Sequence, residues 1–285
     1  MSTQNSEDEN LILPHDLQQA LEQQMHEHNN MQMASFDGLS PQQMGFLQYE
    51  LLNSESGGPL VINHLSEEYL KQCPLLMQLR FLMEKMRDGK TLPLTKTGAL
   101  STTLVKELYA LGHLKNYFVE NGLAKVYKES EIIEIQITRM LLEISSLVKK
   151  RNNKLSLTKK GVKYLDDGNF ILREILNVLL YKFNWAYYDG YGSEAIGQVM
   201  SGYSLYLLKK YGDQERPTSF YAEKYFQAFP DLGHTEKDFR CYGVRTFKRY
   251  FKYMGFVNPS EENGILNLPN VTKTAFMDQL FQING

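Results

Sequence analysis

The sequence predicts a mainly helical protein in which the order helix, β-hairpin, helix occurs twice. Apolar residues recur at steps of three and four through most of the chain, as they do on the buried face of a helix. Two strongly periodic helices are each followed directly by a short strand, a turn and a second strand. A helix, a hairpin wing and a closing helix form the latter half of a winged-helix module. We therefore predict two winged-helix-like modules.

Ahead of the modules, we expect a disordered stretch followed by helices. Residues 1 to about 13 are polar and acidic and have no hydrophobic period. Pro14 suits the first turn of a helix, and Ser40 can cap a second helix that has Pro41 in its first position. The apolar stripe of the first helix would hold Leu17, Leu21, Met25 and His28. The second helix would bury Met44, Leu47 and Leu51.

The first module follows three further helices, which begin after Ser66, at Pro74 and after Ser101, with an extended segment at 90–94. Its own helix is predicted from about Glu131 to Ser146. Strands at 147–151 and 154–158 follow, joined by Asn152-Asn153, because Asn tolerates the positive φ of a two-residue turn. We expect Gly161 to end this element and a helix to restart over 162–165.

The second module lies near the C-terminus. A helix is predicted from Asp238 to Met254, a strand from Gly255 to Asn258, a turn at 260–264 and a returning strand from Ile265 to Leu268. The closing helix would cover 272–281. This interpretation matches Thr158-Lys159 with Thr272-Lys273 and makes the two stretches a weak internal repeat.

An aromatic segment at 170–229 separates the two modules. At helical spacing its tyrosines are expected to pack helices together, with their hydroxyls reaching the surface. Stacking of nucleic-acid bases on them is less favoured, because few cations are interleaved with the rings. Whether the Tyr-rich part at 181–211 holds a ligand stays open. We divide the chain into a partly disordered acidic arm (1–34), a helical domain ending in the first module (35–168) and the remainder (169–285).

Three stretches carry a resemblance to known sequences, namely Leu92 to Leu100, Lys182 to Tyr191 and Ser204 to Gly212. Over about residues 37–281 the chain resembles a loose group of uncharacterised bacterial proteins. Some relatives in that group have a cysteine-rich zinc module of the SEC-C type, which this chain lacks. The resemblance implies a bacterial cytoplasmic origin and no particular activity.

The formal net charge of −2 hides a strong asymmetry along the chain. Eleven acidic residues and no Lys or Arg precede Lys71, so the first seventy residues carry −11 and the remainder carries +9. Such a difference between segments is typical of an interaction surface or of a self-masking arm. The cation-free stretch of residues 1–70 could fold over the basic hairpin of the first module and compete with an external anion.

Little in the sequence points to catalysis, a cofactor or a metal. The two cysteines cannot make a zinc site alone, and His26 and His28 lie on different faces of a helix. Phosphate-binding Gly loops and nucleophile elbows are absent. We therefore expect no enzyme, no catalytic residue, no cofactor and no metal. The lack of a long apolar run and of a signal peptide favours a cytoplasmic protein that makes no contact with membranes.

Two groups of cations are the candidate binding residues. The first hairpin and its flank contain seven cations and no acidic residue from 149 to 163, whereas the helix before it is acidic. The second module has the opposite arrangement, with a cationic helix and a hairpin that contains Glu261 and Glu262. The candidates are Lys149, Lys150, Arg151 and Lys154 on the hairpin, and Arg240, Arg245, Lys248, Arg249 and Lys252 on the outer face of the helix.

Because neither module has both a cationic helix and a cationic wing, the leading hypothesis is a non-enzymatic protein-interaction or regulatory module with an unknown protein partner. The alternative is a winged-helix protein that binds DNA or RNA. An enzyme with an unrecognised site among the tyrosines is the third and weakest hypothesis. The sequence does not fix the oligomeric state.

Overall fold

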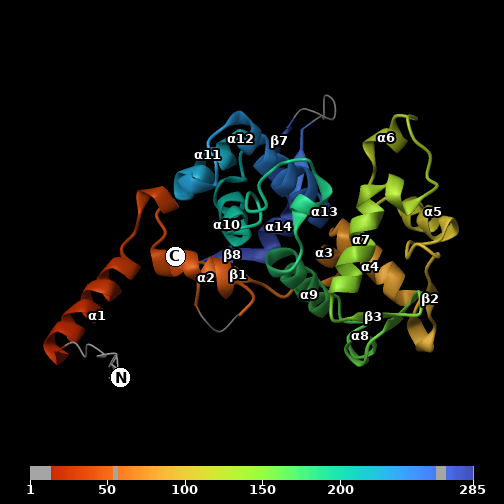
Figure 1. Ribbon diagram of the computed structural model, residues 1–285, viewed down its shortest axis with the longest axis horizontal. Coiled ribbons are helices and arrows are strands. Elements are labelled where there is room, and N and C mark those ends of the chain that lie inside the picture. Colours follow the sequence, from red (N-terminus) through yellow and green to blue (C-terminus); the bar gives the residue numbers. More distant parts are fainter. Residues whose placement is uncertain (1–13, 54–56, 261–267, 285) are drawn as a thin grey trace, which may run out of the picture.

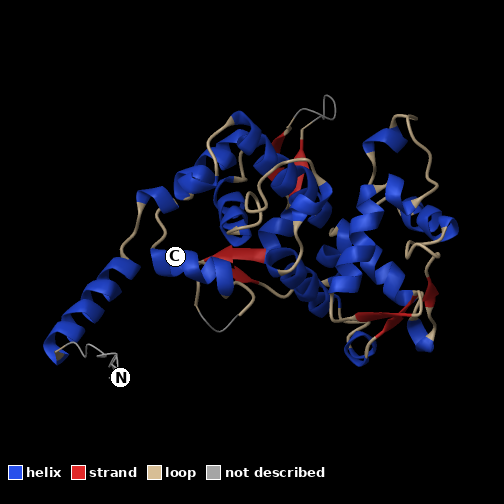
Figure 2. Ribbon diagram, in the orientation of Figure 1, coloured by secondary structure: helices blue, strands red, loops and turns tan. Residues whose placement is uncertain are grey.

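The computed structural model of the chain describes residues 14–53, 57–260 and 268–284. Over these residues helices dominate, and short strands form three small antiparallel sheets (Figures 1 and 2). The mainly helical class predicted from the sequence is confirmed. In the same ranges we find no helix that combines the length and the apolar character needed to cross a bilayer.

The N-terminal part is a projecting helix followed by a capped one. Helix α1 (His15–Asn30) extends away from the rest of the molecule and buries none of its residues (Figure 1). Helix α2 (Pro41–Tyr49) packs against the body through Met44, Leu47 and the following Leu51. The Ser40 hydroxyl accepts the Gln43 N–H at 3.3 Å and the Gln43 side chain accepts the Ser40 N–H at 2.9 Å, so the predicted cap is confirmed.

The first module contains one three-stranded sheet with the order β2-β4-β3. The short helix α3 (Glu67–Leu70) precedes this module, and the short helix α6 (Tyr117–Glu120) lies within it. Its elements are α4 (Pro74–Glu84), β2 (Leu92–Pro93), α5 (Thr102–Ala110), α7 (Ile133–Ile144), β3 (Val148–Arg151), β4 (Lys154–Leu157) and α8 (Lys159–Lys163).

The second module repeats this order, with the sheet β5-β7-β6. Its helix before the hairpin is continuous and has three parts. These are α12 (Glu236–Tyr242), a π-helical stretch, Gly243–Phe251, and α13 (Lys252–Met254). Its elements are α10 (Ser201–Tyr211), β5 (Arg216–Pro217), α11 (Thr218–Ala228), α12 (Glu236–Tyr242), β6 (Val257–Pro259), β7 (Asn270–Lys273) and α14 (Ala275–Leu280).

The correspondence between the two modules extends to single hydrogen bonds. Thr158 donates its backbone N–H to the Leu147 carbonyl at 2.9 Å and its hydroxyl to the preceding carbonyl at 2.8 Å. Thr274 likewise donates its backbone N–H to the Phe256 carbonyl at 2.9 Å and its hydroxyl to the Gly255 carbonyl at 2.7 Å. Each hydroxyl also caps the helix that follows it. The predicted internal repeat is therefore present in the structure, although Thr274 and not Thr272 is the residue that matches Thr158.

The two modules share one hydrophobic core rather than two. Helix α9 (Gly168–Tyr181) contacts α4 and α7, and α13 of the second module packs on α4 of the first. Gly255 lies so close to the other module that a Cβ there would be 2.6 Å from the Gln72 carbonyl oxygen. Strand β1 (Leu60–Ile62) pairs with β8 (Phe281–Ile283) and thereby joins segments from the two ends of the chain.

Two predicted boundaries were wrong for local reasons. Gly161 does not end an element, because it lies inside α8, where a Cβ would be 2.0 Å from the Leu147 carbonyl oxygen. In the second hairpin the returning strand is β7, with Thr272 within it, and the closing helix starts after Thr274. Most of the strand predicted at 265–268, like the stretch at 1–13, lies outside the described residues.

Candidate nucleic-acid interface

The hairpin of β3 and β4 is built by a turn that the sequence specifies. Asn152 and Asn153 have φ values of 50° and 53°, so both adopt the left-handed conformation of a type I′ turn. The register places Val148 opposite Leu157 and Arg151 opposite Lys154. Because side chains alternate along a strand, Val148, Lys150 and Leu155 face the module, and the remaining cations face away from it.

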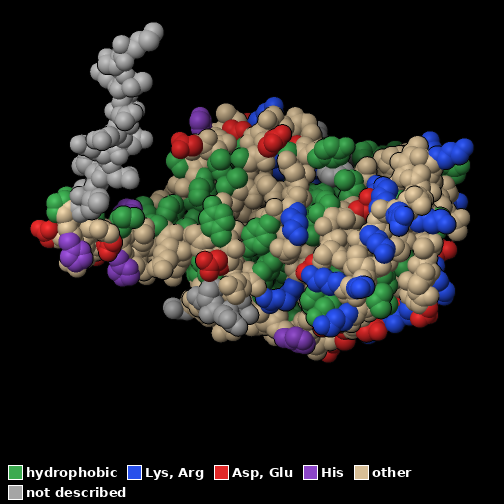
Figure 3. All heavy atoms as spheres, turned by 60° about the horizontal axis from the view of Figure 1, so that its bottom comes forward, with side chains coloured by type: hydrophobic (Ala, Val, Ile, Leu, Met, Phe, Trp, Pro, Cys, Tyr) green, Lys and Arg blue, Asp and Glu red, His purple; other side chains and the backbone are tan. Residues whose placement is uncertain are grey.

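The outer face of this hairpin carries Lys149, Arg151 and Lys154, all of them exposed. Within the described part of the chain, none of the three has a carboxylate at ion-pair distance. Arg151 and Lys154 stand directly opposite each other, and like charges in a cross-strand pair lower stability. Figure 3 shows that Lys and Arg side chains gather on the half of the molecule that contains the first module. This face is therefore an unneutralised cationic surface.

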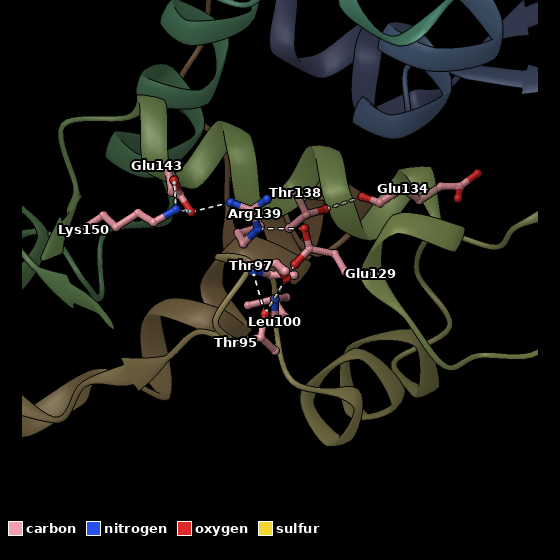
Figure 4. Close-up of polar contacts among 10 residues, drawn as sticks. Thr95, Thr97, Leu100, Glu129, Glu134, Thr138, Arg139, Glu143 and Lys150 are labelled. Carbon is pink, nitrogen blue, oxygen red and sulfur yellow. Dashed lines mark hydrogen bonds and ion pairs between the residues drawn. The ribbon is translucent and has the colours of Figure 1, made fainter. Parts of the chain in front are cut away.

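Lys150 faces the other way and belongs to a chain of ion pairs that runs from the surface to the buried Arg139 and Glu129 (Figure 4). Its Nζ lies 3.3 Å from Glu143, which also pairs with Arg139, and Arg139 donates Nε to Glu129 at 2.7 Å. Glu129 in turn accepts the Leu100 N–H at 2.5 Å. The chain connects the hairpin, α7 and the 95–100 turn, so Lys150 positions the hairpin rather than offering a free charge.

The 95–98 turn adds a cation that sequence reasoning did not include. Leu94 donates its N–H to the Asn153 carbonyl at 2.8 Å, and Gly98 lies against the Lys150 ammonium group, which places this turn beside the hairpin. Lys96, on the same turn, is exposed. The pairing of this turn with a hairpin some fifty residues later has no local signal in the sequence.

Helix α7, which precedes the hairpin, is mostly enclosed by its own module. Glu134, Thr138 and Arg139 are buried along with its apolar residues, and α4, α5 and α9 pack around it. Burial raises the pKa of Glu134, whose carboxylate accepts a hydrogen bond of 2.9 Å from Asn116. Such a helix presents too little polar surface to enter a groove of nucleic acid.

The corresponding helix of the second module does not present its predicted cations as a free outer face. Arg245 is fully buried, donates Nε and Nη2 to Asp189 at 2.7 and 2.9 Å, and donates Nη1 to the Ile196 carbonyl at 2.8 Å. Arg249 lies 3.6 Å from Asp189 and is 14% exposed. Placing Arg245 on the outer face was therefore wrong. The prediction assumed 3.6 residues per turn, whereas the i→i+5 bonding of a π-helix rotates each following side chain.

Arg240, Lys248 and Lys252 are half-buried on the same continuous helix. Lys252 and Arg249 lie near Glu134 at the start of α7, whereas Lys150 pairs with Glu143 near its end. At 1.5 Å per residue these carboxylates are about 13 Å apart along α7. The structure thus places the two predicted groups of cations at opposite ends of α7.

The acidic arm does not cover the hairpin over the described residues. Helix α1 and strands β3 and β4 lie at opposite ends of the molecule (Figure 1). The expected self-masking is therefore wrong for residues 14–30. Residues 1–13, which carry further acidic side chains, lie outside the described part.

The tyrosines and cysteines form core rather than an evident site. Tyr203 and Tyr221 of the aromatic segment are fully buried, and their hydroxyls have no hydrogen-bond partner in the described structure, so the expectation that these hydroxyls reach the surface was wrong for them. Burial raises the pKa of Cys73 and of Cys241 to about 12, so both thiols stay protonated near neutral pH. Among the described residues, we find no cluster of His, Cys, Asp or Glu that could hold a metal ion.

Comparison with known protein families gives a match over part of the chain. Residues 71–170 match the family described as Y4jL N-terminal domain. No curated protein and no solved structure matches the chain. The matched residues begin just before α4 and end at the start of α9, so they coincide with the first module and cover about a third of the chain. The family description names no activity, and the wider resemblance over 37–281 and the SEC-C relatives stay predictions.

Proposed function

We propose that both modules are winged helices and that the protein is a non-enzymatic binding protein whose first module contacts the backbone of nucleic acid. The order α4, β2, α5, α7, β3, β4 and the order α10, β5, α11, α12, β6, β7 support the fold assignment. In each module the middle strand of the sheet is the last one in sequence, as in a winged helix. The hairpins β3-β4 and β6-β7 would be the wings.

The observation that carries the proposal is the outer face of the first wing. Lys149, Arg151 and Lys154 are exposed and lie without a described carboxylate beside them, and two of them form a like-charge cross-strand pair. A phosphate backbone would relieve that repulsion and release its own counterions. In the second module the matching positions hold Asn258, Ser260 and Asn270, so the cationic surface is specific to the first wing.

The same geometry supports contact with phosphates rather than reading of bases. The helix that normally enters the major groove corresponds to α7, and α7 is enclosed and has a buried acidic side chain, Glu134. Phosphate contacts position a protein on nucleic acid and carry no sequence information. We therefore expect affinity that depends strongly on salt and little on sequence.

The test is a triple variant, Lys149→Gln, Arg151→Gln and Lys154→Gln, in the full chain. The matched control removes three exposed cations from other elements, with Lys71→Gln, Lys125→Gln and Lys237→Gln, so that the net charge is equal. Fluorescence anisotropy with short duplexes of unrelated sequences, at about 50 to 200 mM salt, should show at least about a tenfold loss for the wing variant and a salt slope smaller by about 2 to 3. The control variant should change neither quantity by more than about twofold.

Two outcomes would contradict the proposal. One is a wild-type protein that binds neither duplex nor single strand at low salt. The other is an equal loss of affinity in both variants, because that result would attribute binding to net charge instead of to the wing.

A protein partner is the second candidate function, and a separate observation favours it. Helix α1 exposes apolar side chains at one end of the molecule, far from the wing (Figure 1). A surface of this kind is typical of a protein-docking site.

A further inference from the structure

Helix α1 is an amphipathic helix whose apolar side is left uncovered by the described residues. Leu17, Leu21 and Met25 recur every four residues and are 46%, 41% and 63% exposed. All residues of the helix are exposed, and only its C-terminal end lies near the body (Figure 1). An isolated helix of this length is marginally stable in water, because most helical stability in proteins comes from packing of the apolar face. Covering the stripe would supply that missing packing.

The charges beside the stripe define what could cover it. At about 100° per residue, Glu22 lies on one side of the stripe and Asp16 and Glu27 lie on the other. Glu22 and Glu27 accept hydrogen bonds from glutamines four residues earlier, and α1 contains no Lys or Arg. In Figure 3 the projecting helix shows hydrophobic, acidic and histidine side chains. Glu22 borders the stripe, whereas Asp16 and Glu27 lie further round the helix, so the surface combines an apolar stripe with acidic side chains on both of its sides.

The stripe continues towards a hollow on the body. Met31, just after the helix, is 54% exposed. Beyond it, a hollow of about 560 Å³ lies between the end of α1, helix α2 and the segment at 57–59. Phe46 and Tyr49 contribute aromatic surface to it, and the Tyr49 side chain is 73% exposed. A ligand that lies along α1 could therefore extend onto α2.

We propose that α1 docks a basic amphipathic helix supplied by a partner protein. Apolar residues of that helix would pack on Leu17, Leu21 and Met25, and its flanking Lys or Arg side chains would face Asp16, Glu22 and Glu27. A second copy of this chain fits poorly, because pairing α1 with α1 would bring acidic side chains together. Nucleic acid is repelled by the same charges, so this surface is independent of the wing.

The experiment uses a synthetic helical peptide with Leu on one face and Lys on the other, and a scrambled peptide of the same composition. The first variant is Leu17→Gln, Leu21→Gln and Met25→Gln, which leaves the core intact because none of these residues is buried. The second variant is Asp16→Asn, Glu22→Gln and Glu27→Gln. The control replaces exposed apolar residues of other elements, with Leu123→Gln, Tyr127→Gln and Val162→Gln.

Isothermal titration should show that the periodic peptide binds the full chain and that each α1 variant loses at least about tenfold in affinity, or about 1.4 kcal/mol. The second variant should also lose most of the salt dependence, and the control should bind as the wild type does. Thermal melting followed by circular dichroism checks that each variant folds as the wild type does. Sedimentation measures the oligomeric state.

Three results would overturn the inference. Equal binding of the scrambled peptide would show attraction to net charge alone. Undiminished binding by the first variant would place the peptide elsewhere. A concentration-dependent dimer that disappears in the first variant would identify a second copy of the chain as the occupant.

Discussion

At the scale of single residues, the same cationic side chain serves opposite purposes in the two modules. Arg245 gives three hydrogen bonds to Asp189 and Ile196 inside the protein, and the adjacent Gly197, with φ of 74°, leaves room for it. A buried guanidinium must be paired, because an unpaired buried charge costs several kcal/mol. Arg151 lies on the outer face of the hairpin, opposite Lys154. Burial, not residue type, separates a structural cation from a candidate ligand for phosphate.

Glu134 yields a prediction about pH and stability. Burial raises its pKa above the ordinary 4.5, so its charged form is less favourable in the folded state than in the unfolded state. Its favourable contribution is therefore present below the unfolded pKa and is lost as pH rises through the folded value. Glu134→Gln keeps an acceptor for Asn116 and should raise Tm at about pH 8, with little change at about pH 4.

Thermal melts across this pH range would check the expected trend. Glu131→Gln removes an exposed carboxylate just before the same helix and is the matched control. A lower Tm for Glu134→Gln at about pH 8, with no change at about pH 4, would contradict this prediction and show that the charged form is needed by its neighbours Lys252 and Arg249.

At the scale of elements, the paired threonines predict equal effects in the two modules. Thr158 and Thr274 each cap a helix and hold it to the strand that starts the hairpin. Thr158→Val and Thr274→Val keep the shape of the side chain but remove the hydroxyl. Each should lower the free energy of unfolding by about 1 to 2 kcal/mol, as measured by urea denaturation. Thr272→Val, on strand β7 beside the second cap, should lower the free energy of unfolding clearly less. An equal loss there would show that Thr272, and not Thr274, is the counterpart of Thr158.

Elements whose signals are local were predictable, and those that depend on tertiary packing were not. The Asn152-Asn153 turn and the Ser40-Pro41 helix start rest on conformations that single residues favour, and both are present. The exposed state of Lys149, Arg151 and Lys154 follows from strand alternation next to a polar turn. The buried Arg245, in contrast, pairs with Asp189, which is distant in the sequence. Periodicity alone contains no information about such a partner.

At the scale of the whole molecule, the charge asymmetry becomes a separation in space. The sequence shows an acidic first quarter and a basic remainder, and the structure places α1 and the cationic wing at opposite ends (Figures 1 and 3). Two separate surfaces of opposite charge on one molecule favour two different ligands at the same time. A basic partner on α1 and nucleic acid on the wing would then be held together without competing for one site.

A shared core predicts that both modules unfold together. Their buried residues form one cluster, and α13 packs on α4 across the boundary near residue 168 that the sequence suggested between two domains. Calorimetry should therefore give one transition with equal van't Hoff and calorimetric enthalpies.

Gly255→Ala, which would bring a Cβ to 2.6 Å from the Gln72 carbonyl oxygen, should lower the Tm of that whole transition. Gly122→Ala has a similar positive φ but no neighbour within 4 Å, so it should cost only the backbone strain of about 1 to 2 kcal/mol. Two transitions, or a Gly255→Ala effect confined to one of them, would instead show that the modules are independent domains.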